Sequence, residues 1–278
     1  MNPTTVEYLA ADSVDEVMAA LSDGDTAVLA GGQSLILEMT GTCAPPRRVV
    51  DINLVPGLDT LDTGGGTLRV GPLVRHRAFE ADTVRGPLGD LMRAVVCHIG
   101  HPPVRARGTM LGSLAYANPA GEWPALAVTV GAQMVLTGPR GTRTVPAEQF
   151  FTGPFTTVRR PDELLAEVCL PALPEGTGTG YAEDRRTTIY PQAAAMAAVT
   201  VTDGLVSAAA IGLVNAGPCP VRLRAAERIL IGSELSDAAI NAAAAELPFP
   251  GDGPQRRAFG TLTRRALTQA RKKLAGVS

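Results

Sequence analysis

The chain has 278 residues, of which 45% are hydrophobic and 19% charged, so it is long enough for one large or two modest globular domains. Its 25 Lys and Arg residues nearly balance its 27 Asp and Glu residues, and a net charge of -2 provides no overall field for binding nucleic acid or an anionic membrane. No apolar run approaches the ~20 residues that span a bilayer, and the first residues lack the pattern of a secretory signal. Four widely separated cysteines form no metal-binding or redox pair, and free thiols suit a reducing cytoplasm.

The first 55 residues predict a small α/β unit. Ser13 and Glu16 form a capping box ahead of a helix whose apolar residues repeat at i, i+3, i+4 and i+7. A buried strand at Thr26–Ala30, a short apolar segment at Leu35–Met39 and a second strand at Arg48–Ile52 follow.

The next part, to about residue 174, predicts alternating strands and helices around one long polar segment. A helical stripe from Leu88 to Ile99 ends at Gly100, with Pro102 and Pro103 beyond it. A Gly-rich, polar stretch is expected from Arg105 to Glu122. The remaining predictions are strands at Thr67–Val70 and Leu164–Leu170, a helix at Pro124–Val130, and a hairpin of Gln133–Thr137 with Thr142–Val145.

Residues Pro171–Gly180 are rich in Pro, Gly and Thr and predict a domain boundary. A hairpin follows, with strands at 197–202 and 205–213 and a type I′ turn at Asp203-Gly204. Three helices are expected near 224–231, 237–247 and 255–274. The predicted fold class is α+β, with an N-terminal domain at 1–174, split into subdomains at roughly 1–55 and 56–174, and a smaller α+β domain at 175–278.

The first motif that indicates chemistry is Ala30-Gly31-Gly32-Gln33-Ser34, directly after a buried strand. Paired glycines allow positive φ and let a ligand approach the backbone, whose successive N–H groups then form an anion-binding nest. Ser34 adds a hydroxyl donor. An ordinary tight turn is the alternative, and the spacing does not match the G-x-G-x-x-G fingerprint of a Rossmann site.

The second motif extends from Arg105 to Glu122 and combines small residues with hydroxyl, amide and acidic side chains. Backbone and hydroxyl donors, such as those of Thr109 and Ser113, suit phosphates, while acceptors at Asn118 and Glu122 suit sugar hydroxyls. A small-residue packing surface followed by a polar loop is the alternative.

Together these motifs resemble the FAD-binding medium subunits of the molybdenum hydroxylases, the CO dehydrogenase and xanthine dehydrogenase family. Ala30–Leu35 is similar to that family's A-G-G-x-S motif, and Val104–Glu122 to its V-R-N-x-G-T-I-G-G-S-x-x-x-A-D-P-x-x-E segment. Val70–His76, Ile99-Gly100, Arg185–Pro191 and Val214–Val221 match the family pattern in the same order. The likeness therefore covers nearly the whole chain.

The resemblance implies a flavin-binding domain of two α/β subdomains, a C-terminal domain of the CO dehydrogenase flavoprotein type, and non-covalent FAD extended between them. It assigns the diphosphate to Gly31, Gly32, Gln33 and Ser34, with Thr109, Gly112 and Ser113 beside it. It places Asn118 near the ribityl chain and adenosine, and Tyr190 over the isoalloxazine, although Tyr190 is equally consistent with a half-buried aromatic at the domain seam. The full set of expected cofactor-binding residues is Ala30, Gly31, Gly32, Gln33, Ser34, Leu35, Thr109, Gly112, Ser113, Asn118, Glu122 and Tyr190.

Four positions depart from the family pattern. Leu111 replaces the first glycine of the paired glycines, which adds a branched side chain where the backbone normally approaches the cofactor. Asn118 replaces the usual Asp, and Pro103 and Ala106 stand where Gln and Asn are common. These changes bear on FAD affinity and flavin orientation.

Three functions follow from this resemblance. The first is a redox subunit that passes electrons from the iron–sulfur centres of a partner through FAD to an acceptor, within a complex containing a molybdopterin large subunit and an iron–sulfur small subunit. The second is a stand-alone flavin-dependent oxidase, dehydrogenase or oxygenase, which the change at Leu111 motivates. The third is a non-catalytic relative that has lost the flavin. In the first two the flavin itself carries the redox chemistry.

Overall fold

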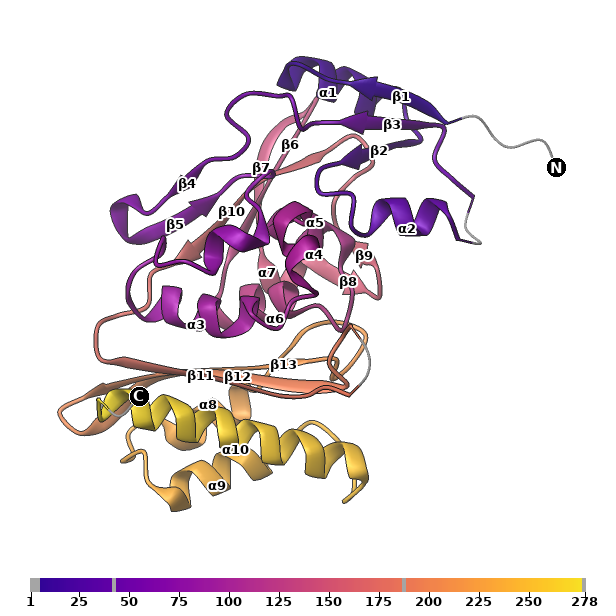
Figure 1. The fold of residues 1–278 in the computed structure, drawn as a ribbon. Coiled ribbons are helices and arrows are strands. Elements are labelled where there is room, and N and C mark those ends of the chain that lie inside the picture. Colours follow the sequence, from indigo (N-terminus) through magenta and orange to yellow (C-terminus); the bar gives the residue numbers. More distant parts are fainter. Residues whose placement is uncertain (1–5, 42–43, 187–188, 277–278) are drawn as a thin grey trace.

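The computed structural model describes residues 6–41, 44–186 and 189–276. Three main layers of sheet follow one another from the N-terminal end to the C-terminal end of the molecule, with helices between and beyond them (Figure 1). The first two layers form the N-terminal part and the third belongs to the C-terminal part, as expected for an α+β chain.

The first layer is a three-stranded parallel sheet in the order β1-β3-β2. Its elements are β1 (Glu7–Ala10), α1 (Val14–Ser22), β2 (Thr26–Leu29), α2 (Leu35–Met39) and β3 (Arg48–Asp51). The predicted cap of α1 is confirmed, because the Ser13 side chain accepts a hydrogen bond from the backbone N–H of Glu16. Strand β1 was not among the predicted elements, and the apolar segment at 35–39 is a short helix.

The second layer is a five-stranded sheet in the order β4-β5-β10-β6-β7, covered by helices. The elements of this part are β4 (Leu61–Asp62), η1 (Gly64–Gly66), β5 (Thr67–Val70), η2 (His76–Phe79), α3 (Gly86–Val96), α4 (Pro102–Arg107), α5 (Met110–Tyr116), α6 (Glu122–Val130), β6 (Gln133–Gly138), β7 (Gly141–Pro146), α7 (Ala147–Phe150), β8 (Phe151–Gly153), β9 (Thr156–Thr157) and β10 (Leu164–Pro171). Strands β8 and β9 pair with each other as a separate two-stranded sheet.

The stretch from Arg105 to Glu122 is more regular than the sequence suggested. Pro102 begins α4, where its missing N–H costs nothing in the first helical turn. Helix α5 follows because Met110, Leu111 and Leu114 bury one face in the core. The stretch that the sequence predicted only as Gly-rich and polar therefore contains α5 and the end of α4.

The third layer is a four-stranded antiparallel sheet in the order β11-β12-β13-β14, followed by three helices. Its elements are β11 (Thr177–Asp184), β12 (Ala193–Thr202), β13 (Leu205–Val214), β14 (Val221–Arg222), α8 (Arg224–Leu230), α9 (Asp237–Ala245) and α10 (Pro254–Leu274). The predicted hairpin turn is confirmed by positive φ at Asp203 and Gly204.

Strand β11 begins inside the segment predicted as a Gly-rich linker. A Cβ atom on Gly178 or Gly180 would lie 2.0 or 2.1 Å from a carbonyl oxygen of α10. These glycines therefore let α10 pack directly on the strand.

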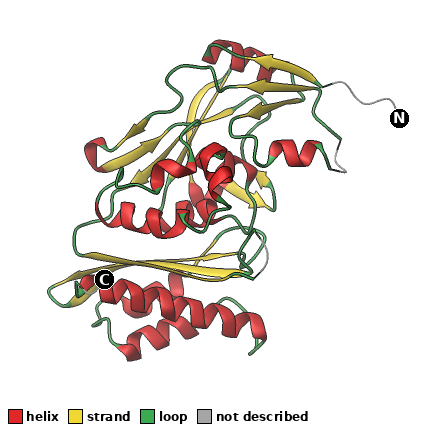
Figure 2. Cartoon of the chain, viewed as in Figure 1, coloured by secondary structure: helices red, strands yellow, loops and turns green. Residues whose placement is uncertain are grey.

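The C-terminal sheet lies between two sets of helices, with α3 and α6 on one face and α8–α10 on the other (Figure 2). Tyr181, Met196 and Val214 of this sheet share one hydrophobic core with the helices of the second layer. The two parts of the chain are thus joined by a packed seam. Within the described residues, no helix is both long and apolar enough to cross a bilayer.

Candidate functional site

The first glycine motif forms an open turn between β2 and α2. Gly32 has φ +73°, a left-handed conformation that glycine adopts without strain. The backbone N–H groups of residues 31–35 donate to no described residue, and the Ser34 side chain makes no capping bond. Buried or half-buried N–H groups normally find acceptors, so this run of donors is suited to an anionic ligand.

The second motif lies directly against this turn. A Cβ atom on Gly31 would lie 2.4 Å from the Arg107 carbonyl oxygen and 2.7 Å from Cα of Gly108. Thr109 then caps α5 by accepting a 3.0 Å hydrogen bond from the N–H of Gly112. The two segments that the sequence singled out separately therefore form one surface.

Two side chains that the sequence did not single out hold these segments together. The amide nitrogen of Asn53 donates to the carbonyl oxygen of Ala30 at 2.8 Å, and its oxygen accepts from Arg75. Arg75 also donates to the Arg107 carbonyl at 2.6 Å. A signal for Asn53 was present, because it follows β3, and the carboxyl ends of neighbouring parallel strands lie at the same sheet edge.

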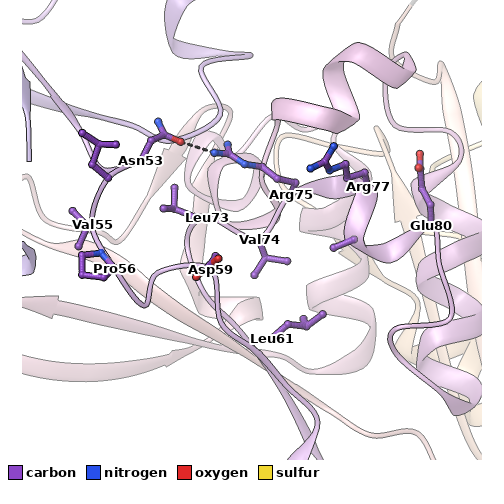
Figure 3. A pocket seen from close by; sticks show the side chains of 12 residues that line it. Asn53, Val55, Pro56, Asp59, Leu61, Leu73, Val74, Arg75, Arg77 and Glu80 are labelled. Carbon is purple, nitrogen blue, oxygen red and sulfur yellow. Dashed lines mark hydrogen bonds between the residues drawn. The ribbon is translucent and has the colours of Figure 1, made fainter. Parts of the chain in front are cut away.

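A groove of about 860 Å³ adjoins Asn53 and Arg75, between the first and second layers. Figure 3 shows the Asn53–Arg75 hydrogen bond at one end of it and Glu80 at the other. Its lining combines apolar side chains with a few polar ones, as ligand grooves usually do: Asn53, Leu54, Val55, Pro56, Asp59, Leu61, Leu73, Val74, Arg75, Arg77, Ala78 and Glu80.

Leu111, the most conspicuous departure from the family pattern, lies away from this surface. Its side chain is 2% exposed and belongs to the core of the second layer, whereas neighbouring Gly112 is exposed. The expectation that a leucine here adds bulk where the cofactor approaches was therefore wrong, because the helical turn of α5 directs this side chain inward.

The other expected cofactor residues lie at the seam with the C-terminal sheet. Asn118 follows α5 and forms a side-chain hydrogen bond with Tyr190, which comes after β11. Glu122 begins α6, is 3% exposed and pairs with Arg185 at 2.8 Å. Arg185 stands in the segment predicted to match the family, of which residues 187–188 lie outside the described part of the chain.

Arg185 belongs to a charged cluster that the sequence did not reveal. It donates from Nε to Glu183 at 2.8 Å, and Glu183 also contacts His98 Nδ1 at 2.9 Å and accepts from the Tyr181 hydroxyl at 3.0 Å. The cluster therefore connects the end of α3, strand β11 and the start of α6.

Burial and pairing act in opposite directions on the two carboxyl groups of this cluster. Burial raises the pKa of Glu122 to about 7, and the bond from Arg185 only partly offsets it. Burial also opposes ionisation of Glu183, but the hydrogen bonds from His98 and Arg185 outweigh it and lower the pKa of Glu183 to about 2. The seam thus holds one readily protonated carboxyl and one firmly ionised carboxylate.

Residues 4–173 match the family described as the FAD binding domain in molybdopterin dehydrogenase, and residues 181–248 match the CO dehydrogenase flavoprotein C-terminal domain. The chain belongs to this FAD-binding flavoprotein family. It is 34% identical to the 6-hydroxypseudooxynicotine dehydrogenase complex subunit alpha of Paenarthrobacter nicotinovorans, over 96% of this chain and 91% of that protein. It is 36% identical to the carbon monoxide dehydrogenase medium chain of Hydrogenophaga pseudoflava, over 88% of this chain and 86% of that one.

The fold agrees with this membership. A solved structure of carbon monoxide dehydrogenase from H. pseudoflava, lacking the Mo-pyranopterin moiety of its cofactor, superposes with a TM-score of 0.90 at 33% identity. The match covers 98% of this chain and 99% of that chain. The family resemblance, the fold class, the oxidoreductase class and the FAD cofactor predicted from the sequence are confirmed.

The residues present fit a flavin dinucleotide. The N–H groups of residues 31–35 donate to no described residue, and they lie beside the close approach of Gly31 to Gly108, where a diphosphate is expected. The adjoining groove provides space for a further part of the nucleotide, and Asn118 and Tyr190 form a polar group at the seam.

Proposed function

We propose that this chain is the flavoprotein subunit of a molybdenum hydroxylase-type dehydrogenase, holding FAD non-covalently between residues 30–35 and 108–113. Bound FAD supplies an electron carrier between iron–sulfur centres of a partner and an external acceptor. The observation that supports this proposal most strongly is the contact of Gly31 with Arg107 and Gly108, beside unpaired backbone donors.

The residues of this chain act by binding and orienting. The N–H groups of residues 31–35 donate hydrogen bonds to diphosphate oxygens, and the hydroxyl groups of Ser34 and Ser113 add donors. Asn53 and Arg75 hold the two segments at a fixed separation, so the donors are positioned before the ligand arrives. We assign the adenosine end to the groove between the first two layers, whose lining offers both apolar side chains and hydrogen-bonding groups.

At the seam, Asn118 and Tyr190 orient the ribityl and ring portion of the cofactor. Glu122 acts through Arg185, because its carboxylate is buried in an ion pair and is not open to a ligand. Arg185 in turn holds Glu183, so the C-terminal domain contributes to the shape of this end of the site.

We also propose a molybdopterin large subunit and an iron–sulfur small subunit as partners, and a cytoplasmic location. The partner assignment is supported by the relatives, which are a medium chain and a complex subunit, and by the match to the FAD binding domain of molybdopterin dehydrogenases. The described cysteines are unpaired thiols, which persist in a reducing compartment. The relatives act on substrates as different as 6-hydroxypseudooxynicotine and carbon monoxide, so this subunit does not define the substrate.

The hypothesis of a stand-alone flavoenzyme rested on Leu111 as a change at the cofactor surface. Because that side chain is buried in the core, this reason no longer holds. Purification of the affinity-tagged chain from its native host tests the choice. We expect two further chains, molybdenum, iron and FAD to co-purify, with a visible flavin spectrum that is released by denaturation. A flavin-loaded, active single chain without metals would instead identify a stand-alone enzyme, and failure to bind added FAD would identify a non-catalytic relative.

A further inference from the structure

His76 is buried directly beneath the second motif and has no role in the site described so far. It is the first residue of η2, and it is 5% exposed. Its backbone N–H donates to the Gly108 carbonyl oxygen at 2.9 Å, and a Cβ atom on Gly108 would lie 2.7 Å from Nε2 and from Cδ2 of the ring. The Nε2 edge of the imidazole therefore occupies the space beside Gly108, the residue against which Gly31 packs.

A hydrogen bond inside the core fixes the position of the ring proton. Trp123 Nε1 lies 2.9 Å from His76 Nδ1, and an indole N–H can only donate. Nδ1 must therefore accept, and Nε2 carries the proton of the neutral ring. Neutrality is consistent with the surroundings, because burial, reinforced by Arg105 and Arg75, lowers the pKa of His76 to about 4.

The proton on Nε2 has no acceptor among residues 6–41, 44–186 and 189–276. Although the His76 side chain is only 5% exposed, its Nε2 atom is not enclosed by protein atoms, so this N–H can reach an acceptor outside the chain. The ring nitrogens lie on opposite sides of the imidazole, so Nε2–H is directed away from Trp123 and past Gly108. Position 108 is glycine, which leaves this edge of the ring uncovered by a side chain.

We propose that His76 donates its Nε2–H to a diphosphate oxygen of the bound dinucleotide, with Trp123 as the positioning residue that fixes the donor tautomer. This inference rests on the proposed function, because it requires FAD to lie between residues 30–35 and 108–113. A neutral donor supplies a hydrogen bond to the anion without adding another cation beside Arg75 and Arg107.

The first test compares dinucleotide affinity in matched variants of the purified full chain. His76→Leu removes the donor and keeps an apolar side chain of similar bulk, so we expect FAD and ADP to bind about 10- to 100-fold more weakly. His76→Gln presents an N–H near the position of Nε2, and we expect it to recover most of the affinity. His101→Gln, at an exposed histidine outside the site, is the control and should bind as the wild type does.

A spectroscopic readout separates direct contact from a structural role. The chain has three histidines, so the Nε2–H signal of His76 can be assigned in ¹⁵N-histidine-labelled protein by comparison with His76→Gln. We expect this proton to move downfield when FAD or ADP is added. Trp123→Phe removes the bond to Nδ1, so it should give a mixture of ring tautomers and an intermediate loss of affinity.

The outcomes separate this inference from the proposed function. A wild-type chain that binds neither FAD nor ADP overturns both. A wild-type chain that binds FAD, with a folded His76→Leu variant of unchanged affinity, overturns only the role of His76. If His76→Leu does not fold, the labelled wild type decides, because an Nε2–H signal unmoved by FAD and ADP overturns the role and a downfield shift supports it.

Discussion

The two ends of the proposed FAD site are built in different ways. At the diphosphate end, residues 30–35 meet 107–109 through glycine and backbone atoms, and side chains mainly hold the segments in place. At the seam end, side chains from three elements form a charged cluster around Arg185. The first end therefore depends on the absence of side-chain atoms, whereas the second depends on balanced charges.

This contrast predicts the largest loss of FAD affinity at Gly31. In Gly31→Ala the new Cβ would lie 2.4 Å from the Arg107 carbonyl oxygen, so the two segments must move apart. Loss of two hydrogen bonds to the phosphates, each contributing about tenfold, weakens FAD binding by about 100-fold. Titration of the apo chain with FAD, followed by flavin fluorescence, measures the effect.

Gly253→Ala is the matched control, because nothing lies within 4 Å of its Cβ position and its φ of -62° suits alanine. It should bind FAD as tightly as the wild type. Equal binding by a folded Gly31→Ala variant would mean that the diphosphate lies elsewhere.

At the seam end, a substitution should lower the free energy of unfolding more than it lowers FAD affinity. Arg185→Met leaves Glu122 and Glu183 without their shared cation, and breaking such a buried pair typically costs about 3 kcal/mol of unfolding free energy. FAD affinity should fall less than in Gly31→Ala, because no phosphate donor is lost. Chemical denaturation and FAD titration of the same sample separate the two effects.

Two further variants sharpen this result. Adding Glu122→Gln to Arg185→Met removes the buried carboxyl group that has lost its cation. It should recover part of the lost stability at pH 8, where ionisation of this group is most costly. Arg224→Met breaks the exposed pair with Glu148 and should cost no more than about 1 kcal/mol. An equal loss in Arg224→Met and Arg185→Met would show that burial of the Arg185 cluster has no energetic importance.

The same contrast explains what the sequence could predict. The glycine motifs at 31–32 and 108–112 are local and matched a family pattern, and the long apolar periodicities gave most helices and strands. The Arg185 cluster joins residues 98, 122, 183 and 185, which no local pattern connects. Leu111 was misplaced because a motif alignment gives the residue at a position but not the direction of its side chain.

A pH-dependent effect on stability, similar in size to that of Arg185→Met, is expected from Glu122. Its folded-state pKa of about 7 lies above its usual value of 4.5, so the folded chain binds a proton that the unfolded chain has released. The stabilising contribution of protonated Glu122 is therefore complete below about pH 4.5 and is lost as the pH rises through about 7. The difference between these two pKa values corresponds to about 3 kcal/mol of unfolding free energy.

Denaturation of the wild type and Glu122→Gln at several pH values between 5 and 8 measures this contribution. The wild type should lose stability relative to the variant as the pH rises, because every other titrating group is common to both proteins. Glu183 does not interfere, since its pKa of about 2 keeps it ionised throughout this range. A constant difference between the two proteins would mean that Glu122 stays ionised in the fold.

The smallest effect on FAD binding is expected at Leu111, although a substitution there should lower the free energy of unfolding strongly. Leu111→Ala removes a side chain that is 2% exposed, and such truncations cost about 2–5 kcal/mol of unfolding free energy. The exposed neighbour Gly112 keeps its N–H bonded to Thr109, so the start of α5 stays in place beside the donor groups of residues 31–35. At a temperature where the variant is folded, its dissociation constant for FAD should stay within about twofold of the wild type. Tighter binding would show instead that the leucine obstructs the cofactor, and would restore the reason for considering a flavin site altered from that of the family.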